Sequence, residues 1–154
     1  MRSKIEASDL RSHIGYRLRV VSNAVSQSFA KKLAASGVTV AEWVILREIY
    51  SSKEKTSPSA VAEMIGLTRG AVSKLIERLL GKGLVARSES SVDRRHQEIK
   101  LTANGIKLVP KLARIADEND EAFFSVLPGP ERKMLMNTLM KIAEIHSLSA
   151  NPIE

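Results

Sequence analysis

Cysteine is absent from the sequence, and aromatic residues are scarce. The 154 residues include no cysteine, one tryptophan, two tyrosines and three phenylalanines. The absence of cysteine excludes disulfides, zinc sites with thiolate ligands, iron–sulfur clusters and sensing by thiol oxidation within this chain. Because aromatic residues make up only 4% of the sequence, the core has to be built mainly from aliphatic side chains.

Long hydrophobic runs and a secretory signal are missing as well. No stretch approaches the roughly 20 apolar residues that a membrane span needs. The first ten residues mix charged and polar side chains and lack the apolar centre of a signal peptide. We therefore expect a cytoplasmic protein with no membrane partner. The length of 154 residues and the apolar content of 44% are typical of one globular domain.

Basic residues exceed acidic ones, and the excess is unevenly distributed. The formal net charge is +7. Residues 1–35 hold seven basic and two acidic residues, residues 57–101 hold eight and five, and residues 102–154 hold six and seven. An anionic partner such as nucleic acid should therefore meet the first two thirds of the chain. A modest excess that only aids solubility is the alternative.

Apolar residues recur at helical spacing through most of the chain. In the first 37 residues they form a narrow stripe, which is typical of a helix that packs against a second subunit as well as its own domain. Asp9 or Ser8 can cap this helix, and Gly37 can end it. Thr39 and Glu42 form a capping box for a second helix, which is followed by a polar loop over residues 51–56.

A helix–turn–helix pattern follows over residues 57–82. Ser57 and Pro58 start a short helix, Gly66 fits a turn with positive φ, and Thr68 can cap the second helix. Small and apolar residues occupy the positions where the two helices would cross. An ordinary pair of antiparallel helices inside a bundle is the alternative. The crossing residues are Val61, Ala62, Ile65, Leu67, Val72 and Leu75.

The second helix of this pair has a polar, mostly basic face opposite its apolar stripe. A recognition helix places such a face in the major groove, where arginine can pair with guanine and the helix N-terminus can hold a phosphate. Gly70 has no side chain, so the helix could approach DNA closely. A solvated face without a partner is the alternative. The candidate contacts are Thr68, Arg69, Gly70, Ser73, Lys74 and Arg78.

The hydrophobic period changes to two after Gly83. Alternation over residues 84–89 and 96–101 predicts a β-hairpin with a polar loop. Asp93, Arg94 and Arg95 lie in this loop. Arginine is favoured by the enhanced negative potential of a narrow minor groove, and Asp93 could orient a neighbouring arginine through an ion pair. A charged turn without a partner is the alternative.

Two helices are predicted after the hairpin. Thr102 can cap the first, which reaches Phe124 and in which Pro110 should cause a kink or an interruption. Residues 127–130 break the chain, and a last helix ends near residue 145.

Residues 10–146 resemble the MarR family of winged helix–turn–helix transcription regulators. Ser90, Ser91 and Val92 depart from the pattern, because many members carry an acidic residue and a further arginine there. The motifs that carry the resemblance are the helix–turn–helix over 58–80, Gly83-Leu84-Val85, Asp93-Arg94-Arg95, and Leu101-Thr102 with Gly105.

The resemblance implies a mainly α fold with a small β-hairpin wing. It implies one intertwined domain, in which residues 1–37 and 102–154 form dimerisation helices around a DNA-binding region over 38–101. It also implies a homodimer that represses from a pseudo-palindromic operator in double-stranded DNA and is released by a small aromatic or phenolic acid.

The first helix offers candidate residues for such an effector. His13 and Arg17 are four residues apart and should share a face. Together with Tyr16 and Trp43 they could bind an aromatic carboxylate between the DNA-binding region and the dimer helices. Hydrogen bonds of His13 and Arg17 within the chain or across a dimer are the alternative.

No pattern in the sequence indicates catalysis. There is no nucleophile–base pair, no glycine-rich phosphate loop and no cluster of metal ligands. We therefore expect no enzyme activity, cofactor or metal. The alternative to a DNA-binding regulator is a winged-helix module that binds a ligand or a protein without reading DNA sequence.

Overall fold

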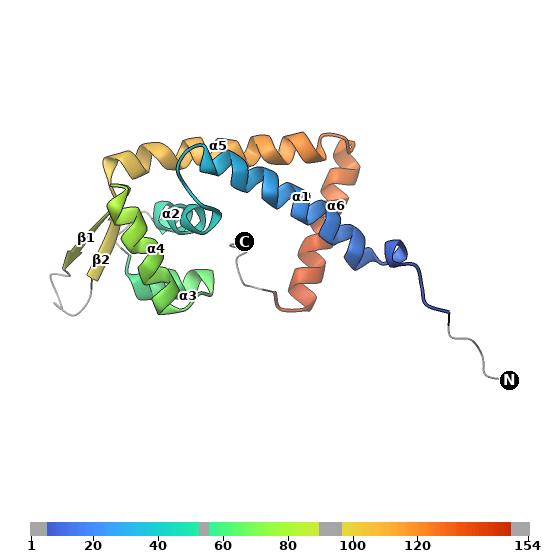
Figure 1. Cartoon of the computed structure of the whole chain (residues 1–154), viewed down its shortest axis with the longest axis horizontal. Coiled ribbons are helices and arrows are strands. Elements are labelled where there is room, and N and C mark those ends of the chain that lie inside the picture. The colour runs from blue at the N-terminus through green and yellow to red at the C-terminus, as the bar shows by residue number, and fades with distance from the viewer. Residues whose placement is uncertain (1–5, 53–55, 90–96, 149–154) are drawn as a thin grey trace.

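The computed structural model describes residues 6–52, 56–89 and 97–148. These residues form six α-helices and a two-stranded hairpin (Figure 1), which confirms the predicted mainly α class with a small wing. The elements are a 3-10 turn (Leu10–Ser12), α1 (Ile14–Ala34), α2 (Val40–Ser52), α3 (Pro58–Ile65), α4 (Arg69–Gly81), β1 (Val85–Glu89), β2 (Gln97–Leu101), α5 (Ala103–Phe124) and α6 (Gly129–Ile145).

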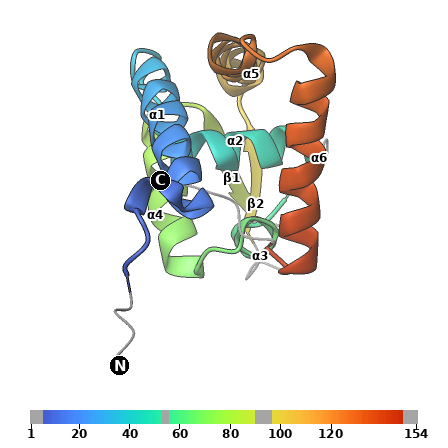
Figure 2. The ribbon, with the colours of Figure 1, turned by 90° about the vertical axis from the view of Figure 1, so that its right-hand side faces the viewer.

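The elements form two parts, a compact head (α2, α3, α4 and the hairpin) and an extended frame (α1, α5 and α6). Helices α2, α3 and α4 and the hairpin gather at one end of the molecule, while α5 runs away from them along one edge with α1 packed against it (Figure 1). Helix α6 follows the far end of α5 and runs in a different direction (Figure 1). In Figure 2, α1 and α6 lie on opposite sides of the molecule, below α5. Since α6 makes only sparse contacts with the other described elements, most of its surface is open.

Side-chain caps begin most of the helices at the predicted residues. The Thr39 hydroxyl accepts a hydrogen bond from the Glu42 amide at 3.2 Å, and a Glu42 carboxylate oxygen accepts one from the Thr39 amide at 3.1 Å. Ser57 and Thr102 cap α3 and α5 in the same way, through the amides of residues 60 and 105. The capping box and these two caps are therefore confirmed.

The start of the first helix differs from the prediction. Asp9 caps only the short 3-10 turn, through a 3.2 Å hydrogen bond from the amide of Arg11. His13 then has an extended backbone (φ −79°, ψ 127°), so α1 begins at Ile14. The Ser12 hydroxyl donates to the Asp9 carbonyl at 2.6 Å, and such local side-chain bonds compete with a continuous helix.

The sequence predicted a kink or an interruption at Pro110, and the structure shows no interruption of α5 there. The helix continues from Ala103 to Phe124. Val109 and Leu112, on either side of the proline, are fully buried in the core, while Pro110 itself is exposed. The carbonyl that loses its helical partner therefore faces the solvent side, where water can hydrate it, and the packing of the buried neighbours holds the helix together.

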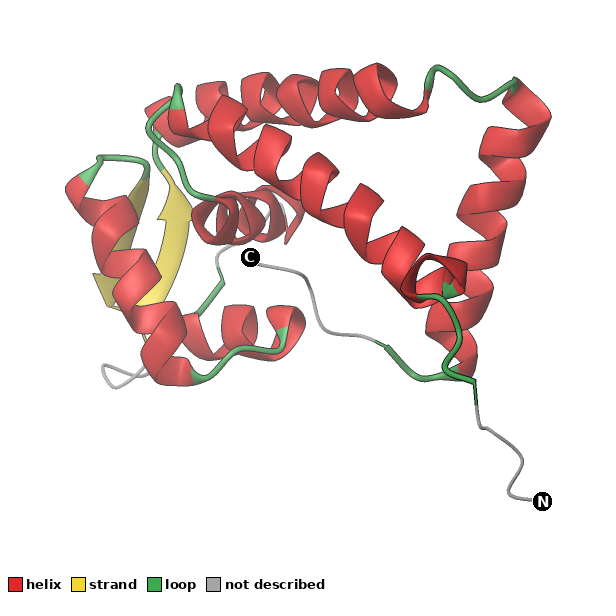
Figure 3. Cartoon of the chain, turned by 45° about the vertical axis from the view of Figure 1, so that its right-hand side comes forward, coloured by secondary structure: helices red, strands yellow, loops and turns green. Residues whose placement is uncertain are grey.

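The hairpin pairs residue 85 with 101 through to residue 89 with 97, in antiparallel register. Thr56 adds a bridge on the other side of β2: the Thr56 amide donates to the Ile99 carbonyl at 3.1 Å, and the Thr56 carbonyl accepts from the Ile99 amide at 2.7 Å. The sequence placed Thr56 in a loop. Figure 3 shows both strands inside the head, beside the helix–turn–helix.

The core is aliphatic, as the composition predicted, and joins the head to one end of the frame. Its buried residues come from α2, α3, α4, the hairpin and α5, with Leu33 supplied by α1 and with Val38 and Leu84 supplied by connections. Two polar side chains are buried within it, Glu42 and Asn119. Within the described ranges, no helix is long and apolar enough to cross a membrane.

Candidate nucleic-acid interface

The turn between α3 and α4 is built by two residues with special roles. Gly66 adopts a left-handed conformation (φ 72°, ψ 22°), which costs a residue without Cβ little. The Thr68 hydroxyl then accepts a hydrogen bond from the Ala71 amide at 3.2 Å and caps α4. Ala62 and Val72 are buried where the two helices meet. The predicted helix–turn–helix is therefore present.

Helix α4 separates its apolar and polar residues completely. Val72, Leu75, Ile76 and Leu79 are buried. On the opposite face, the side chains of Arg69, Lys74 and Arg78 form no hydrogen bond or ion pair with another described residue. Within the described part of the chain, these three cations therefore have no anionic partner. All six predicted candidates are exposed, as are Glu77 and Gly81; the candidates are Thr68, Arg69, Gly70, Ser73, Lys74 and Arg78.

The N-terminus of α4 adds hydrogen-bond donors to this basic face. As at any helix start, the first amides, including those of Arg69 and Gly70, have no acceptor within the helix. A Cβ built on Gly70 meets no described atom within 4 Å. The packing of the described residues therefore does not require glycine at this position, and the surface there is open to close approach.

The wing is joined to α4 by an ion pair that the sequence reasoning missed. Arg87 of β1 donates to a carboxylate oxygen of Glu77 at 2.8 Å. The two residues are ten apart, a separation at which no helical or strand period predicts contact. Asp93, Arg94 and Arg95, the predicted wing contacts, lie outside the described residues.

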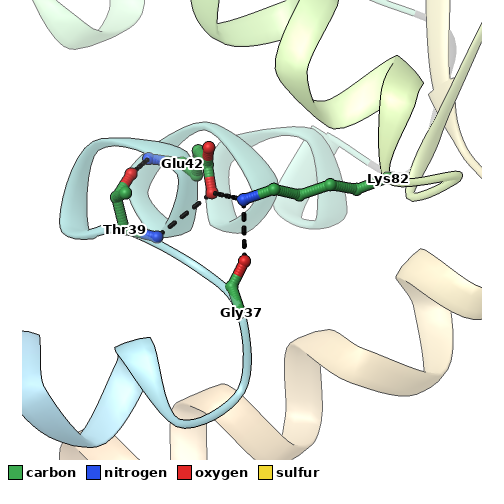
Figure 4. Close-up of polar contacts among 4 residues, drawn as sticks. All are labelled: Gly37, Thr39, Glu42 and Lys82. Carbon is green, nitrogen blue, oxygen red and sulfur yellow. Dashed lines mark hydrogen bonds and ion pairs between the residues drawn. The ribbon is translucent and has the colours of Figure 1, made fainter.

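A second ion pair ties the C-terminal end of α4 to the start of α2, as Figure 4 shows. The ammonium of Lys82 lies 2.7 Å from a Glu42 carboxylate oxygen and 2.7 Å from the Gly37 carbonyl oxygen. Glu42 is 1% exposed. The capping box predicted a local role for Glu42, but its pairing with a residue 40 positions away had no signal in the sequence.

The predicted effector residues do not all come together within one chain. His13 and Arg17 bond to the segment before α1: the imidazole is 3.2 Å from both the Ser8 hydroxyl and the Leu10 carbonyl, and Arg17 donates to the Arg11 carbonyl at 2.9 Å. Tyr16 is half-buried beside them.

Trp43 lies near the other end of α1, where its ring packs edge-on against Phe29 with centroids 6.4 Å apart. Phe29 follows His13 by sixteen residues, about 24 Å along a helix axis. Trp43 and the His13 group therefore do not line one pocket within a single chain.

Arg17 does line a hollow of about 410 Å³ between α1, α5 and α6. The rest of its wall is apolar and includes two aromatic rings. Among residues 6–52, 56–89 and 97–148, no group of three or more potential ligands lies close enough together to hold a metal ion. The other lining residues are Ile14, Leu18, Val21, Phe123, Phe124, Val126, Leu127 and Leu135.

Comparisons with known proteins agree with this geometry. A family model described as "MarR family" matches residues 36–96. The HTH-type transcriptional regulator SarZ of Staphylococcus haemolyticus is 27% identical over 138 residues, which cover 90% of this chain and 92% of SarZ.

Two solved structures are similar over most of the chain. The DNA complex of Staphylococcus aureus MepR has a TM-score of 0.75 and 27% identity, covering 86% of this chain and 97% of MepR. Bordetella bronchiseptica BpsR, described in terms of the regulation of its DNA binding by 6-hydroxynicotinic acid, has a TM-score of 0.74 and 25% identity, covering 90% of this chain and 98% of BpsR.

Proposed function

Because this chain belongs to the MarR family, we propose that it is a transcription regulator that recognises a specific sequence in double-stranded DNA. The observation that carries the proposal is the polar face of α4, where exposed Arg69, Lys74 and Arg78 pair with no described residue. The existence of a MepR–DNA complex supports it, since MepR matches this chain over both head and frame.

In the proposed complex, α4 enters the major groove with its N-terminal half toward the base edges. Arg69 and Ser73 reach bases, while Lys74 and Arg78 reach bases or phosphates. The free amides at the start of α4, with the Thr68 hydroxyl, hold a phosphate. Arg94 and Arg95 of the wing reach into the adjacent minor groove.

We further propose that the protein works as a homodimer joined through α1, α5 and α6. The support is the apolar surface that the frame leaves uncovered: Ile14 of α1 is 85% exposed, and Met134, Met140 and Ile145 of α6 are each at least 60% exposed. An isolated soluble chain rarely exposes contiguous apolar surface of this kind. A second copy would cover it and bring two heads to the two halves of a pseudo-palindromic site.

For regulation, we propose a repressor whose DNA binding is weakened by a small aromatic or phenolic acid. BpsR provides the precedent, as its DNA binding is regulated by 6-hydroxynicotinic acid. In this chain Arg17 could pair with a carboxylate while the aromatic rings beside it pack on the ligand. His13 directly precedes α1 and Tyr16 lies in its first turn, close in sequence to Arg17, whereas Trp43 packs against Phe29.

The test is the ratio of specific to non-specific affinity. A site selected from a pool of random duplexes should be bound at least about 10³-fold more tightly than unrelated duplex at physiological salt. A ratio near one would contradict sequence-specific regulation and favour an architectural DNA binder or a winged-helix module that does not read DNA. Binding at low salt alone does not discriminate, since a basic dimer binds any polyanion.

A further inference from the structure

One ammonium group joins the C-terminal end of α4 to two neighbouring sites that lie 40 and 45 positions earlier in the sequence. Lys82 is the C-cap residue of α4, directly after Gly81. Its Nζ lies 2.7 Å from the carboxylate of Glu42 in the first turn of α2, and 2.7 Å from the carbonyl of Gly37 in the connection between α1 and α2 (Figure 4). The side chain therefore links the C-terminal end of the proposed reading helix to the start of α2 and to the connection that joins α2 to α1.

Burial makes this link costly to break. Glu42 is 1% exposed, and the same carboxylate oxygen that meets Lys82 also accepts the Thr39 amide at 3.1 Å. A buried carboxylate needs such partners, and its place in the first turn of α2 adds the favourable field of a helix N-terminus. Without Lys82, the carboxylate would keep its burial and lose its only cationic partner among the described residues.

We propose that Lys82 is a positioning residue for DNA binding, which holds α4 at a fixed angle to α1 and thereby sets the separation of the two reading helices in the dimer. The inference rests on the proposed function. Helix α4 has 13 residues and is about 20 Å long. A rotation of about 10° around its Lys82 end moves its N-terminus by about 3.4 Å, which is one base-pair step.

Operator spacing provides the first test. The affinity of the Lys82→Met variant is measured for the selected full site, for a single half-site, and for full sites with one or two base pairs inserted or removed at the centre. We expect about a tenfold loss on the full site, a flatter dependence on spacing, and half-site affinity within about twofold of the unsubstituted protein.

Two variants serve as references for that test. Lys82→Arg keeps a cation that can reach both acceptors and should restore the spacing preference. Lys107→Met removes one positive charge from an exposed site on α5 and should leave the preference unchanged. If Lys82→Met keeps the spacing profile, or if half-site and full-site affinity fall together, the positioning role is wrong.

A second measurement needs no DNA and therefore separates this inference from the proposed function. Because the chain has no cysteine, cysteines introduced at exposed Gln27 of α1 and Ser73 of α4 would be the only sites for spin labels. The distance between the labels is measured by pulsed electron paramagnetic resonance, with excess unlabelled protein so that labelled chains do not pair with each other. Lys82→Met should broaden or shift the distance distribution, and an unchanged distribution overturns the inference.

The double variant Glu42→Gln/Lys82→Met covers the case in which Lys82→Met does not fold. It removes the buried charge, while the glutamine carbonyl can still accept the Thr39 amide. The double variant should also broaden the label distances, and a narrow, unshifted distribution in the folded double variant overturns the proposal. The unsubstituted protein could bind all DNA sequences alike while Lys82→Met still changes the label distances. In that case the proposed function is wrong, and the positioning of α4 by Lys82 is supported.

Discussion

Gly105 lies so close to the carbonyl oxygen of Leu84 that a side chain at this position has no room. A Cβ built on Gly105 would overlap that oxygen, and it would also meet a methyl group of Leu101 at 3.3 Å. The same carbonyl accepts the Thr102 amide at 3.0 Å. The start of α5 is thus pressed against the junction between α4 and β1, where backbone cannot easily give way.

Replacing Gly105 with alanine should destabilise the protein. Although alanine favours helices, its methyl group would force α5 away from Leu84, at a cost of about 1–3 kcal/mol. Chemical denaturation measures the change in the free energy of unfolding. Gly15→Ala is the control, because no described atom lies within 4 Å of a Cβ there, and it should leave stability equal or higher. Equal effects of the two substitutions would contradict the close packing.

Replacing Gly70 with alanine should have opposite effects on stability and on DNA binding. The position is open in the free protein, so the gain in helix propensity should stabilise it by roughly 0.5–1 kcal/mol. The added methyl group would meet DNA if α4 approaches the groove closely, and affinity for the selected site should fall. Denaturation and fluorescence anisotropy measure the two effects. Affinity that stays unchanged would show that α4 does not approach DNA at Gly70.

The basic residues of α4 and the wing should differ in what they contribute. Arg69→Ala should cost roughly 1–3 kcal/mol of binding free energy and relax specificity at one base pair, as expected for an arginine that reads guanine. Lys74→Ala should weaken all sequences alike and reduce the salt slope by about one if it contacts a phosphate.

The wing is tested by the double variant Arg94→Ala/Arg95→Ala, which should weaken binding to the selected site. Its charge-matched control is Lys107→Ala/Lys111→Ala, at exposed positions of α5 that are not among the proposed DNA contacts. Unchanged affinity of the wing variant in an anisotropy titration contradicts a minor-groove contact.

A charge in the apolar surface of α6 should separate the dimer. Met140 is 60% exposed, and glutamate there would have to be desolvated in a dimer interface. Sedimentation velocity should show a shift from dimer toward monomer, with loss of full-site affinity. Met64→Glu, at an exposed position of α3 in the head, should leave the dimer intact. A monomeric unsubstituted protein would contradict the dimer directly.

Aromatic carboxylates should stabilise the folded protein if Arg17 binds them. A ligand at 100 times its dissociation constant adds about 2.7 kcal/mol to stability, which a thermal-shift screen detects. The shift should disappear in Arg17→Ala and persist in Arg19→Ala, a matched change on the same helix. A hit whose shift survives Arg17→Ala would place the effector elsewhere, and a screen without hits in a protein that binds DNA would remove the support for this class of effector.

The sequence was informative wherever one short segment sets the geometry. The caps at Thr39, Ser57, Thr68 and Thr102, and the left-handed turn at Gly66, were predicted because each depends on residues within about four positions. The polar face of α4 was predicted for the same reason, since helical period alone determines which side chains share a face.

Errors arose where neighbouring structure overrides local preference. Pro110 lowers helix propensity, yet the buried residues on either side keep α5 continuous. Thr56 lies in a polar stretch, yet pairing with Ile99 extends the sheet. In both cases the contacts that decide the local structure are made with distant parts of the chain, and hydrophobic periodicity over a few residues does not predict such contacts.

By itself, the sequence determined the helical and hairpin elements, the helix–turn–helix and its basic face, because propensity, capping and period act over a few residues. Tertiary structure alone decided how that face is held. The pairs Lys82–Glu42, Arg87–Glu77 and Gly105–Leu84 join separate elements. Their contacts depend on how the whole chain packs around its aliphatic core, and packing is a collective property that no single segment encodes.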